Sequence, residues 1–315
     1  MDITNNSLTR KRLLITGASG LLGSNLLFFL KDRYDILGLY YKNSIKAAGV
    51  QIKQVNILNL NELVKAFDAF SPDVVLHAAA LADINRCEDD PALARQVNVV
   101  GTENVVCAAR RLSATIVYIS TDQVYDGSTN SCCETDVPHP LNVYASTKLE
   151  AENIVLIYSQ GLVLRSNLFG WDVITHRSLA EWVIAELKEG QIVTGFQDVM
   201  FSTLYTADIA DLLVEFLDNK PKGVYNFGAH SALSKYDFLR LVARGAGFAE
   251  DNVLRGFIVE TPLRVVRAKN LSLNVTRLES LLRHPVPTIE ESVGRFFADR
   301  ANGIPALLRK CIQRY

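Results

Sequence analysis

Residues 13–23 read LLITGASGLLG, a short apolar run that leads into a glycine-rich turn and then into further leucines. The run Leu13–Ile15 is typical of a buried strand, and the pattern from Leu21 to Leu30 is helical. Glycines at positions 17, 20 and 23 stand at this strand-to-helix turn, which is where a dinucleotide-binding turn places them. The motif alone leaves open an ordinary glycine-rich turn that binds nothing.

The alternation of strand and helix continues along the chain. We expect strands at Ile36–Tyr40, Val74–His77, Ile116–Ser120 and Leu162–Leu164, and helices at Leu60–Phe70, Arg95–Leu112 and Lys148–Tyr158. Strands that alternate with helices predict an α/β protein with a Rossmann-type, doubly wound parallel sheet. The strands read as continuous apolar runs because both faces of such a sheet are buried.

Beyond residue 168 the alternation weakens and helices stand among proline-punctuated loops. Helices are expected at Ser178–Lys188, Ala207–Asn219, Tyr236–Gly245 and Ile289–Asp299, and a strand that returns to the sheet is expected at Gly223–Phe227. We therefore expect residues 1–168, together with 202–230, to form an NAD(P)-binding Rossmann domain. Residues 169–201 and 231–315 would form a smaller, interleaved C-terminal substrate-binding lobe.

Composition narrows the function classes. The 315 residues contain 33 Lys and Arg against 34 Asp and Glu, a net charge of -1, which lacks the basic excess of a nucleic-acid binder. The five cysteines form no CxxC pattern, and no apolar stretch is long enough to cross a membrane. The polar N-terminus lacks the features of a signal peptide. We expect a cytoplasmic protein with reduced thiols, without nucleic-acid or membrane partners and without a metal, because no metal-ligand spacing is present.

The segment after the second strand bears on the choice of cofactor. NAD-binding turns place a carboxylate there for the ribose 2′-hydroxyl. This chain has Tyr41 and Lys42 instead, with Lys46 shortly after, so we expect NADP (as NADPH) rather than NAD. The alternative is that both lysines are ordinary solvated side chains. Asn56 and Ile57 are expected near the adenine, and the small residues Ala78, Ala79 and Ala80 leave room for the cofactor beside the chain.

A candidate catalytic pair follows in the same half of the chain. Tyr144 and Lys148 are one turn apart on a predicted helix, where the ammonium would lower the pKa of the phenol and allow proton exchange near neutral pH. In isolation this pair is equally typical of a solvated helix face. Thr121, within Ser120-Thr121-Asp122 at a strand end, supplies a hydroxyl that could bind a substrate oxygen. His77, also at a strand end, is expected to be a packed residue rather than a base.

These motifs, taken in order, resemble an extended short-chain dehydrogenase/reductase, and within that group the dTDP-4-dehydrorhamnose reductase-like (RmlD-like) branch of nucleotide-sugar enzymes. The matching stretches are GASGLLG at 17–23, AAALADINRCE at 78–88, NVVGT at 98–102, ISTDQVYDG at 119–127, PLNVYASTK at 140–148, LRSN at 164–167, TADIA at 206–210 and GVYNFG at 223–228. The resemblance covers most of the chain.

The resemblance implies specific roles. Thr121, Tyr144 and Lys148 would be the catalytic residues, with Lys148 also holding the nicotinamide ribose and Asn98 helping to orient it. The cofactor would contact Gly17, Ser19, Gly20, Leu21, Leu22, Gly23, Tyr41, Lys42, Asn56, Ile57, Ala78, Ala79, Ala80, Asn98, Ser120, Tyr144 and Lys148. The substrate would contact Asp83, Asp122, Gln123, Asn167 and Trp171.

The implied reaction is the reduction of a keto group of a nucleotide sugar by NADPH, with the tyrosine as proton donor. Gln123 stands where similar dehydratases carry a glutamate, which argues against dehydration because an amide cannot transfer the proton. Two alternatives stay open: a nucleotide-sugar epimerase on the same scaffold and a non-catalytic NADP-binding regulatory subunit. The expected partner is a small-molecule substrate, and a homodimer is left open as the assembly.

Overall fold

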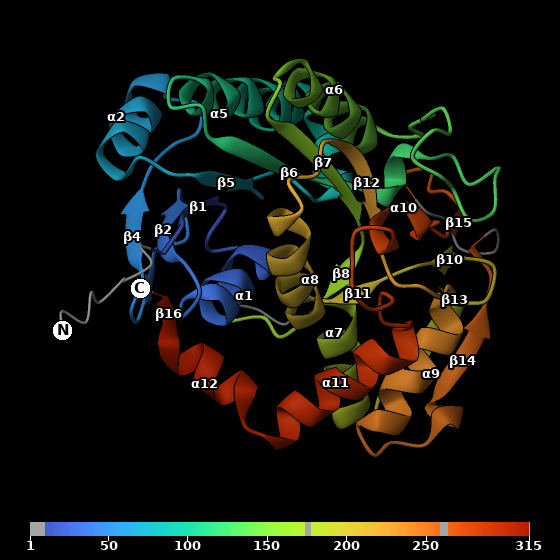
Figure 1. The fold of residues 1–315 in the computed structure, drawn as a ribbon. Helices are drawn as coiled ribbons and strands as arrows, with labels where there is room; N and C mark the ends of the chain where they lie inside the picture. The colour runs from blue at the N-terminus through green and yellow to red at the C-terminus, as the bar shows by residue number, and fades with distance from the viewer. Residues whose placement is uncertain (1–9, 174–177, 259–263, 315) are drawn as a thin grey trace.

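The centre of the computed structural model is a parallel sheet of seven strands in the order β12-β7-β6-β5-β1-β2-β4 (Figure 1). These strands are β1 (Arg12–Thr16), β2 (Asp35–Tyr40), β4 (Gln51–Gln54), β5 (Val74–His77), β6 (Thr115–Thr121), β7 (Gly161–Ser166) and β12 (Gly223–Phe227). The structure describes residues 10–173, 178–258 and 264–314, so the parts of the predicted domains at 1–9, 174–177, 259–263 and 315 lie outside the described residues. The prediction of a Rossmann-type doubly wound sheet is confirmed.

Helices cover both faces of this sheet. Figure 1 shows α2 (Leu60–Phe70), α5 (Gly101–Arg110) and α6 (Val143–Ile157) above it, and α1 (Leu21–Leu30) and α8 (Thr206–Asp218) below it. Neighbouring residues of β1 belong to different hydrophobic clusters, since Leu13 and Ile15 pack on the α1 side and Leu14 packs on the α2 and α5 side. Side chains alternate across a strand, so two buried faces require the continuous apolar run seen in the sequence.

The strand register brings the polar strand ends together. Thr16 of β1 pairs with His77 of β5, and Thr121 of β6 pairs with Ser166 of β7. The strand order reverses at β1, which has β2 on one side and β5 on the other. In such sheets a ligand crevice opens at the carboxyl ends of the strands beside the reversal.

The helix expected at Arg95–Leu112 differs from the prediction in its middle. The structure has α4 (Pro91–Arg95), then a π-helical turn, η1 (Gln96–Val100), and then α5. The extra backbone residue in such a turn commonly marks a functional position in a helix. Here it contains Asn98, whose side chain holds two other segments of the chain, as described below.

The smaller lobe is assembled from helices and very short strands. The expected helices are present as α7 (Leu179–Lys188), α9 (Lys235–Gly245) and α11 (Ile289–Ala301). Short sheets unite β8 (Leu168–Phe169) with β11 (Leu204–Tyr205), β9 (Val193–Phe196) with β14 (Val253–Gly256), and β10 (Met200–Phe201) with β13 (Leu233–Ser234) and β15 (Asn270–Leu271). No sequence pattern predicted these strands, because most of them are only two residues long and all pair with distant segments.

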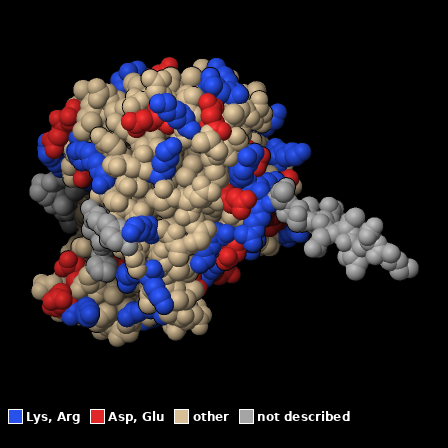
Figure 2. All heavy atoms as spheres, turned by 90° about the vertical axis from the view of Figure 1, so that its left-hand side faces the viewer, with Lys and Arg blue, Asp and Glu red and all other residues tan. Residues whose placement is uncertain are grey.

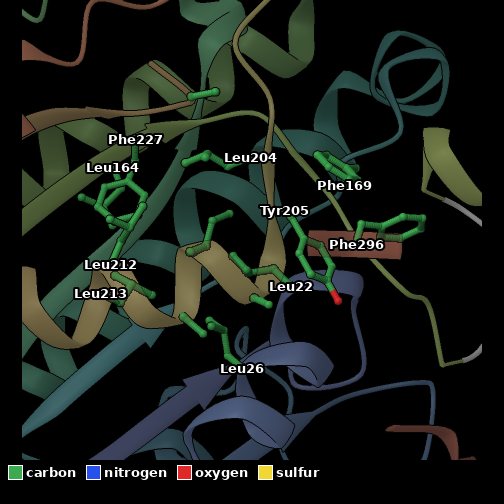
Figure 3. Close-up of a cluster of buried hydrophobic side chains, with 14 of the residues drawn as sticks. Leu22, Leu26, Leu164, Phe169, Leu204, Tyr205, Leu212, Leu213, Phe227 and Phe296 are labelled. Atoms are coloured by element: carbon green, nitrogen blue, oxygen red, sulfur yellow. The ribbon is translucent and has the colours of Figure 1, made fainter. Parts of the chain in front are cut away.

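One continuous aromatic and aliphatic cluster joins the lobe to the sheet. Figure 3 shows Leu22 and Leu26 of α1 on the same core as Phe169, Tyr205 and Phe296. Phe169 lies 5.6 Å from Phe296 and 5.8 Å from Tyr205, measured between ring centroids. Since the two parts share a core, the lobe is fixed on the sheet by apolar burial.

The end of the chain returns to the first part of the sequence. After α12 (Ile304–Cys311), which the sequence did not predict, β16 (Ile312–Arg314) pairs antiparallel with β3 (Ile45–Ala47), and Ala48 N donates to Cys311 O over 2.9 Å. Ile312 and Ile45 are both buried. The last strand of residues 231–315, which we expect to belong to the smaller lobe, therefore pairs with β3 of the first part of the chain. The burial of the two isoleucines stabilises this pairing.

The surface carries both signs of charge. Figure 2 shows the face at the left of Figure 1, where Lys and Arg side chains stand in separate groups with Asp and Glu among them. Within the described ranges, no helix is both long and apolar enough to span a bilayer.

The remaining short elements are α3 (Ile84–Asp89), η2 (Asp122–Val124), η3 (Glu250–Asn252) and α10 (Thr276–Glu279).

Candidate active site

The glycine turn has the geometry of a phosphate-binding turn. Gly17 has φ +70°, and a Cβ there would come within 2.7 Å of the Ala79 nitrogen. A Cβ on Gly23 would lie 2.2 Å from the Gly17 oxygen, so neither position accepts a side chain. Gly20 caps α1 without any side-chain hydrogen bond, which leaves the first N–H groups of the helix to a ligand. The turn therefore fits a dinucleotide pyrophosphate at Gly17–Gly23, with Ser19 and the backbone of Leu21 and Leu22 at the helix start.

The loop after β5 lies against this turn. The backbone at Ala78 and Ala79 is what a side chain at Gly17 would meet, so the loop Ala78–Ala80 and the turn form adjacent walls. Larger residues in the loop would narrow the space between them. The predicted cofactor residues of β1 and β5 are thus brought together at the sheet reversal.

His77 is a packed residue, as predicted. The Thr102 hydroxyl donates to Asn98 O over 2.6 Å and therefore accepts from Nε2 of His77 over 3.0 Å. Nδ1 then accepts from the Thr16 hydroxyl over 2.6 Å. Burial, and next the charge of Lys148, lower the pKa of His77 to about 3. The imidazole is neutral and both of its nitrogens are satisfied.

The predicted adenosine residues lie at the far edge of the sheet. Tyr41 and Lys42 are exposed just after β2, with the Lys42 ammonium 5.8 Å from the Tyr41 ring centroid. Asn56 and Ile57 follow β4, the strand beside β2. The Asn56 carboxamide oxygen accepts from Leu58 N over 3.0 Å, and Ile57 O accepts from Asn104 over 3.0 Å. The four residues therefore share one edge, although the Asn56 oxygen serves a local turn.

Thr121 and Tyr144 are brought together at the end of β6. Asn142 caps α6 by accepting from Ala145 N over 2.9 Å, which places Tyr144 in the first turn of the helix. Burial raises the pKa of Tyr144 above its usual value, the neighbouring Thr121 hydroxyl lowers it, and the charge of Asp122 raises it. Thr121 is itself buried, and its hydroxyl donates to Asp122 Oδ1 over 3.1 Å.

Lys148 lies one turn further along α6 and is buried. Its ammonium donates to Ile119 O over 2.6 Å and stands 4.0 Å from the Tyr118 ring centroid. Burial lowers the pKa of Lys148 to about 7, and the carboxylate of Glu152 opposes that shift. The expectation that Lys148 lowers the pKa of Tyr144 is wrong for this structure, because burial is the largest influence on the phenol and the ammonium is bound to a backbone carbonyl.

Asn98 joins the loop after β5 to α6. Its amide nitrogen donates to Leu81 O over 3.1 Å and to the Thr147 hydroxyl over 3.0 Å, and its carboxamide oxygen accepts from Leu81 N over 2.8 Å. Thr147 directly precedes Lys148. The π-helical turn thus directs the Asn98 side chain at Thr147. Asn98 is linked to Lys148 through the backbone of α6, because Thr147 and Lys148 are adjacent.

Asp122 and Asn167 are hydrogen-bonded to each other next to Thr121. Asn167 donates to Asp122 Oδ2 over 2.8 Å, and Gln123 N donates to the Thr121 hydroxyl over 3.2 Å. Burial raises the pKa of Asp122 to about 6, opposed by its hydrogen bonds and by the charge of Lys235. Lys235, at the start of α9, is a cation near this carboxylate that the sequence did not reveal, because a lysine at a helix start is normally solvated.

The other two predicted substrate residues, Trp171 and Asp83, make contacts of their own in the fold. Trp171 is buried in the shared core, stacked on Phe296 with ring centroids 3.9 Å apart, so the structure does not bring it to Asp122. Asp83 caps α3 by accepting from Arg86 N over 3.1 Å and is exposed. Among the residues that the structure describes, no group of three or more His, Cys, Asp or Glu could hold a metal ion.

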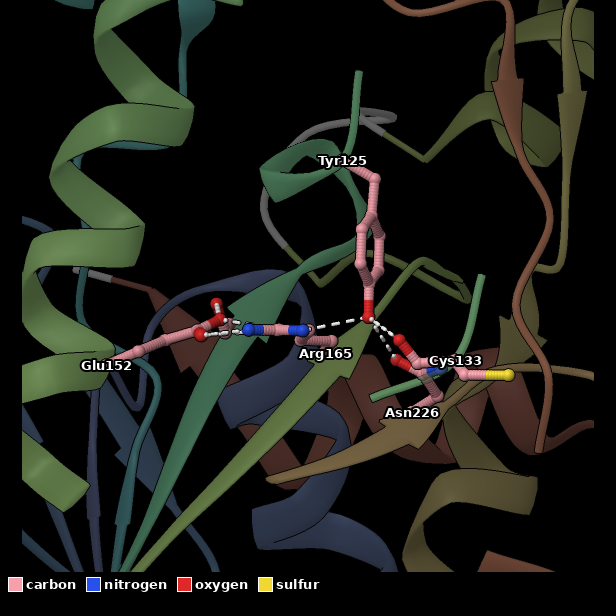
Figure 4. A network of polar contacts seen from close by, with 6 residues as sticks. Tyr125, Cys133, Glu152, Arg165 and Asn226 are labelled. Atoms are coloured by element: carbon pink, nitrogen blue, oxygen red, sulfur yellow. Dashed lines mark hydrogen bonds and ion pairs between the residues drawn. The ribbon is translucent and has the colours of Figure 1, made fainter. Parts of the chain in front are cut away.

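Behind the site is a polar network that the sequence analysis missed. Glu152 of α6 pairs with Arg165 of β7, with Nη2 and Oε2 2.7 Å apart (Figure 4). Arg165 also donates to Tyr125 Oη over 2.7 Å, and Tyr125 donates to Cys133 O over 2.8 Å. The sequence feature that could have predicted this network is the arginine inside an otherwise apolar strand, because a buried charge requires a buried partner.

A parallel Rossmann sheet, a glycine turn after β1, a hydroxyl at the end of β6 and a Tyr and Lys pair on the next helix define an extended, NAD(P)-dependent short-chain dehydrogenase/reductase. More particularly, the chain belongs to the RmlD substrate binding domain family, which matches residues 11–302.

Three relatives illustrate the similarity. The chain is 31% identical over 238 residues to dTDP-4-dehydrorhamnose reductase of Aggregatibacter actinomycetemcomitans, covering 72% of this chain and 76% of that protein. It is 28% identical over 314 residues to methionine adenosyltransferase 2 subunit beta of Mus musculus, covering 92% and 89%. A crystal structure of dTDP-4-dehydrorhamnose reductase from Bacillus anthracis in complex with NADP superposes with a TM-score of 0.82 at 25% identity, covering 92% and 100%.

Proposed function

We propose that the protein uses NADPH to reduce a keto group of a nucleotide sugar. The main supporting observation is that Thr121, Tyr144 and Lys148 lie together at the carboxyl end of β6. The glycine turn and the Ala78–Ala80 loop face each other at the same end of the sheet. The similarity to dTDP-4-dehydrorhamnose reductases supports the same substrate class.

The residues divide the work of the reaction. The nicotinamide, when bound, supplies the hydride. Thr121 binds and orients the keto oxygen, and Tyr144 Oη donates the proton that this oxygen takes up. Lys148 holds the nicotinamide ribose. Asp122, Gln123 and Asn167 contact the sugar from the side of the smaller lobe, which is proposed to bind the substrate.

NADP is the proposed cofactor. Lys42 stands exposed at the end of β2, where a 2′-phosphate would take a charge-assisted hydrogen bond. No acidic side chain occurs between residues 36 and 61 to favour the ribose 2′-hydroxyl of NAD. The NADP complex of the Bacillus anthracis reductase agrees with this choice.

The test is NADPH oxidation by the purified protein with a panel of nucleotide 4-keto sugars, beginning with dTDP-4-dehydrorhamnose. The expected result is turnover of at least one sugar with NADPH, and weaker turnover with NADH. No oxidation with any member of the panel, by protein that binds NADPH, would overturn the proposal. A tightly retained NAD together with sugar interconversion and no net NADPH use would indicate the epimerase instead.

A second candidate is a non-catalytic NADP-binding regulatory subunit. Full-length similarity to methionine adenosyltransferase 2 subunit beta favours it, since 92% of this chain takes part in that alignment. The discriminating result is a stable complex with a second protein from the native cell, combined with NADPH binding and no reductase activity on the panel.

A further inference from the structure

Lys148 and Glu152 reach the same short piece of β6 from the same face of α6. The Lys148 ammonium donates to Ile119 O, and the next residue, Ser120, donates its hydroxyl to Glu152 Oε1 over 2.5 Å. Glu152 lies one helical turn beyond Lys148, the spacing at which side chains on a helix are neighbours. Both residues are almost fully buried, since 2% of the surface of Lys148 and 1% of that of Glu152 are exposed.

Arg165 fixes the position of that carboxylate. Its Nε donates to the two Glu152 oxygens over 3.1 and 3.2 Å, and its Nη2 donates to Oε2 over 2.7 Å. Arg165 is paired in register with Ser120 in the sheet, so both donors to Glu152 stand side by side on neighbouring strands. Tyr125 and Asn226 continue the network toward β12 (Figure 4). The carboxylate therefore has no freedom to turn away.

Among the groups around Lys148, Glu152 is the one that provides a negative charge to balance the ammonium. His77 on β5 is neutral, and Tyr118 on β6 is a buried phenol whose pKa is raised well above its usual value. Tyr144 on α6 is likewise protonated at neutral pH, because burial raises its pKa. Arg165 is a cation directed at the carboxylate. Glu152 alone raises the pKa of Lys148 against the effect of burial.

We propose that Glu152 is a positioning residue for the reduction, acting through Lys148, and that Arg165 holds its carboxylate in place. This inference rests on the proposed function. A buried ion pair costs desolvation that its own attraction hardly repays, so replacement by neutral residues of similar size should be tolerated by the fold. The replacement removes the negative charge that keeps Lys148 protonated. As the pH is raised, the rate of hydride transfer would therefore begin to fall at a lower pH than in the wild type.

The test is the pH profile of kcat for the double variant Glu152→Gln/Arg165→Met. The alkaline limb of the profile is expected to move down by about one pH unit, with KM for the sugar little changed. The conservative variant Glu152→Asp keeps the charge and should restore the wild-type limb. An unchanged limb in the double variant would overturn the inference, since a purely structural pair lowers stability without moving the profile.

A matched control is Asp208→Asn/Arg295→Met, which removes another carboxylate–arginine pair, between α8 and α11. Its profile should coincide with that of the wild type. If the double variant at the site does not fold, Glu152→Gln alone retains hydrogen-bonding capacity toward Ser120 and Arg165 and takes its place.

A readout that does not need turnover separates this inference from the proposed function. In the NADPH-bound protein with ¹³C-labelled lysine, the resonance missing from Lys148→Met identifies Lys148, and its titration can be followed directly. A lower midpoint in the double variant supports the inference even if no sugar is reduced. A midpoint equal to that of the wild type contradicts it, whatever the activity.

Discussion

Two carboxylate–arginine pairs in this molecule have similar geometry and different surroundings. Glu152 and Arg165, 2.7 Å apart, lie between α6 and β7 with side chains 1% and 4% exposed. Asp208 and Arg295, 2.8 Å apart, join α8 to α11, with the carboxylate 4% and the arginine 37% exposed. The first pair lies beside Lys148 and the second beside Ser292, whose hydroxyl donates to Asp208 over 2.6 Å. The contrast is one of burial: both members of the first pair are buried next to the proposed catalytic lysine, whereas the arginine of the second pair is partly solvated.

The largest expected effect in the strand-end region is that of Tyr144→Phe. Removing the proton donor should lower the rate of hydride transfer by about 10²- to 10⁴-fold. The free energy of unfolding should change by only about 1 kcal/mol, because one hydroxyl is lost. Single-turnover kinetics and chemical denaturation measure the two effects. Thr206→Ala, a buried hydroxyl at the start of α8, is the control that should leave the rate intact.

The two pairs differ in what breaking them should cost. Arg165→Met leaves the Glu152 carboxylate buried without its partner and should destabilise the fold by about 3–5 kcal/mol. Arg295→Met leaves the buried Asp208 carboxylate with the Ser292 hydroxyl as a remaining donor and should cost about 1–3 kcal/mol. Urea denaturation of both variants compares them directly. Equal losses would mean that burial does not distinguish the pairs.

Asp122 offers a pH-dependent prediction. Its pKa in the folded protein is raised from 3.8 to about 6, so the folded state holds this proton more tightly than the unfolded state. The resulting stabilisation is present below pH 3.8 and is lost as the pH rises through about 6. Asp122→Asn should remove this pH dependence of stability, which is on the order of 3 kcal/mol. Unfolding free energies of both proteins across that interval test it, and parallel curves would refute it.

The smallest expected effect is at the adenosine edge. Lys42→Ala should weaken NADPH binding about tenfold, through loss of one charge-assisted contact, and leave NADH binding unchanged. Fluorescence titration at low salt measures both affinities. Lys65→Ala, an exposed lysine on α2, should affect neither. A similar loss for NADPH and NADH would show that Lys42 does not read the 2′-phosphate.

How much the sequence revealed depended on the range of the contacts. The strand Val74–His77 and the helix Leu60–Phe70 have the predicted bounds, because a buried parallel strand and an amphipathic helix are local patterns. The glycine turn and the meeting of Thr121 with Tyr144 followed from motif order and strand polarity. In the first part of the chain, β1, β2, β5 and β6 could thus be predicted from the sequence, whereas β3 and β4 were not.

Features that depend on distant partners were missed. β16 pairs with β3 only because the chain returns across the molecule, and Trp171, for which the resemblance implied a substrate contact, stacks on Phe296. The counter-charge at Glu152 and the cation at Lys235 were hidden for the same reason, since burial decides whether a charged side chain is solvated or functional.

The most direct test is a crystal structure of the protein with NADP⁺ bound. The account predicts that the pyrophosphate lies on the turn Gly17–Gly23 and that the nicotinamide ring lies beside the Tyr144 hydroxyl, with its ribose on Lys148. A dinucleotide bound elsewhere, or a nicotinamide held away from Tyr144 with the sheet unchanged, would contradict it.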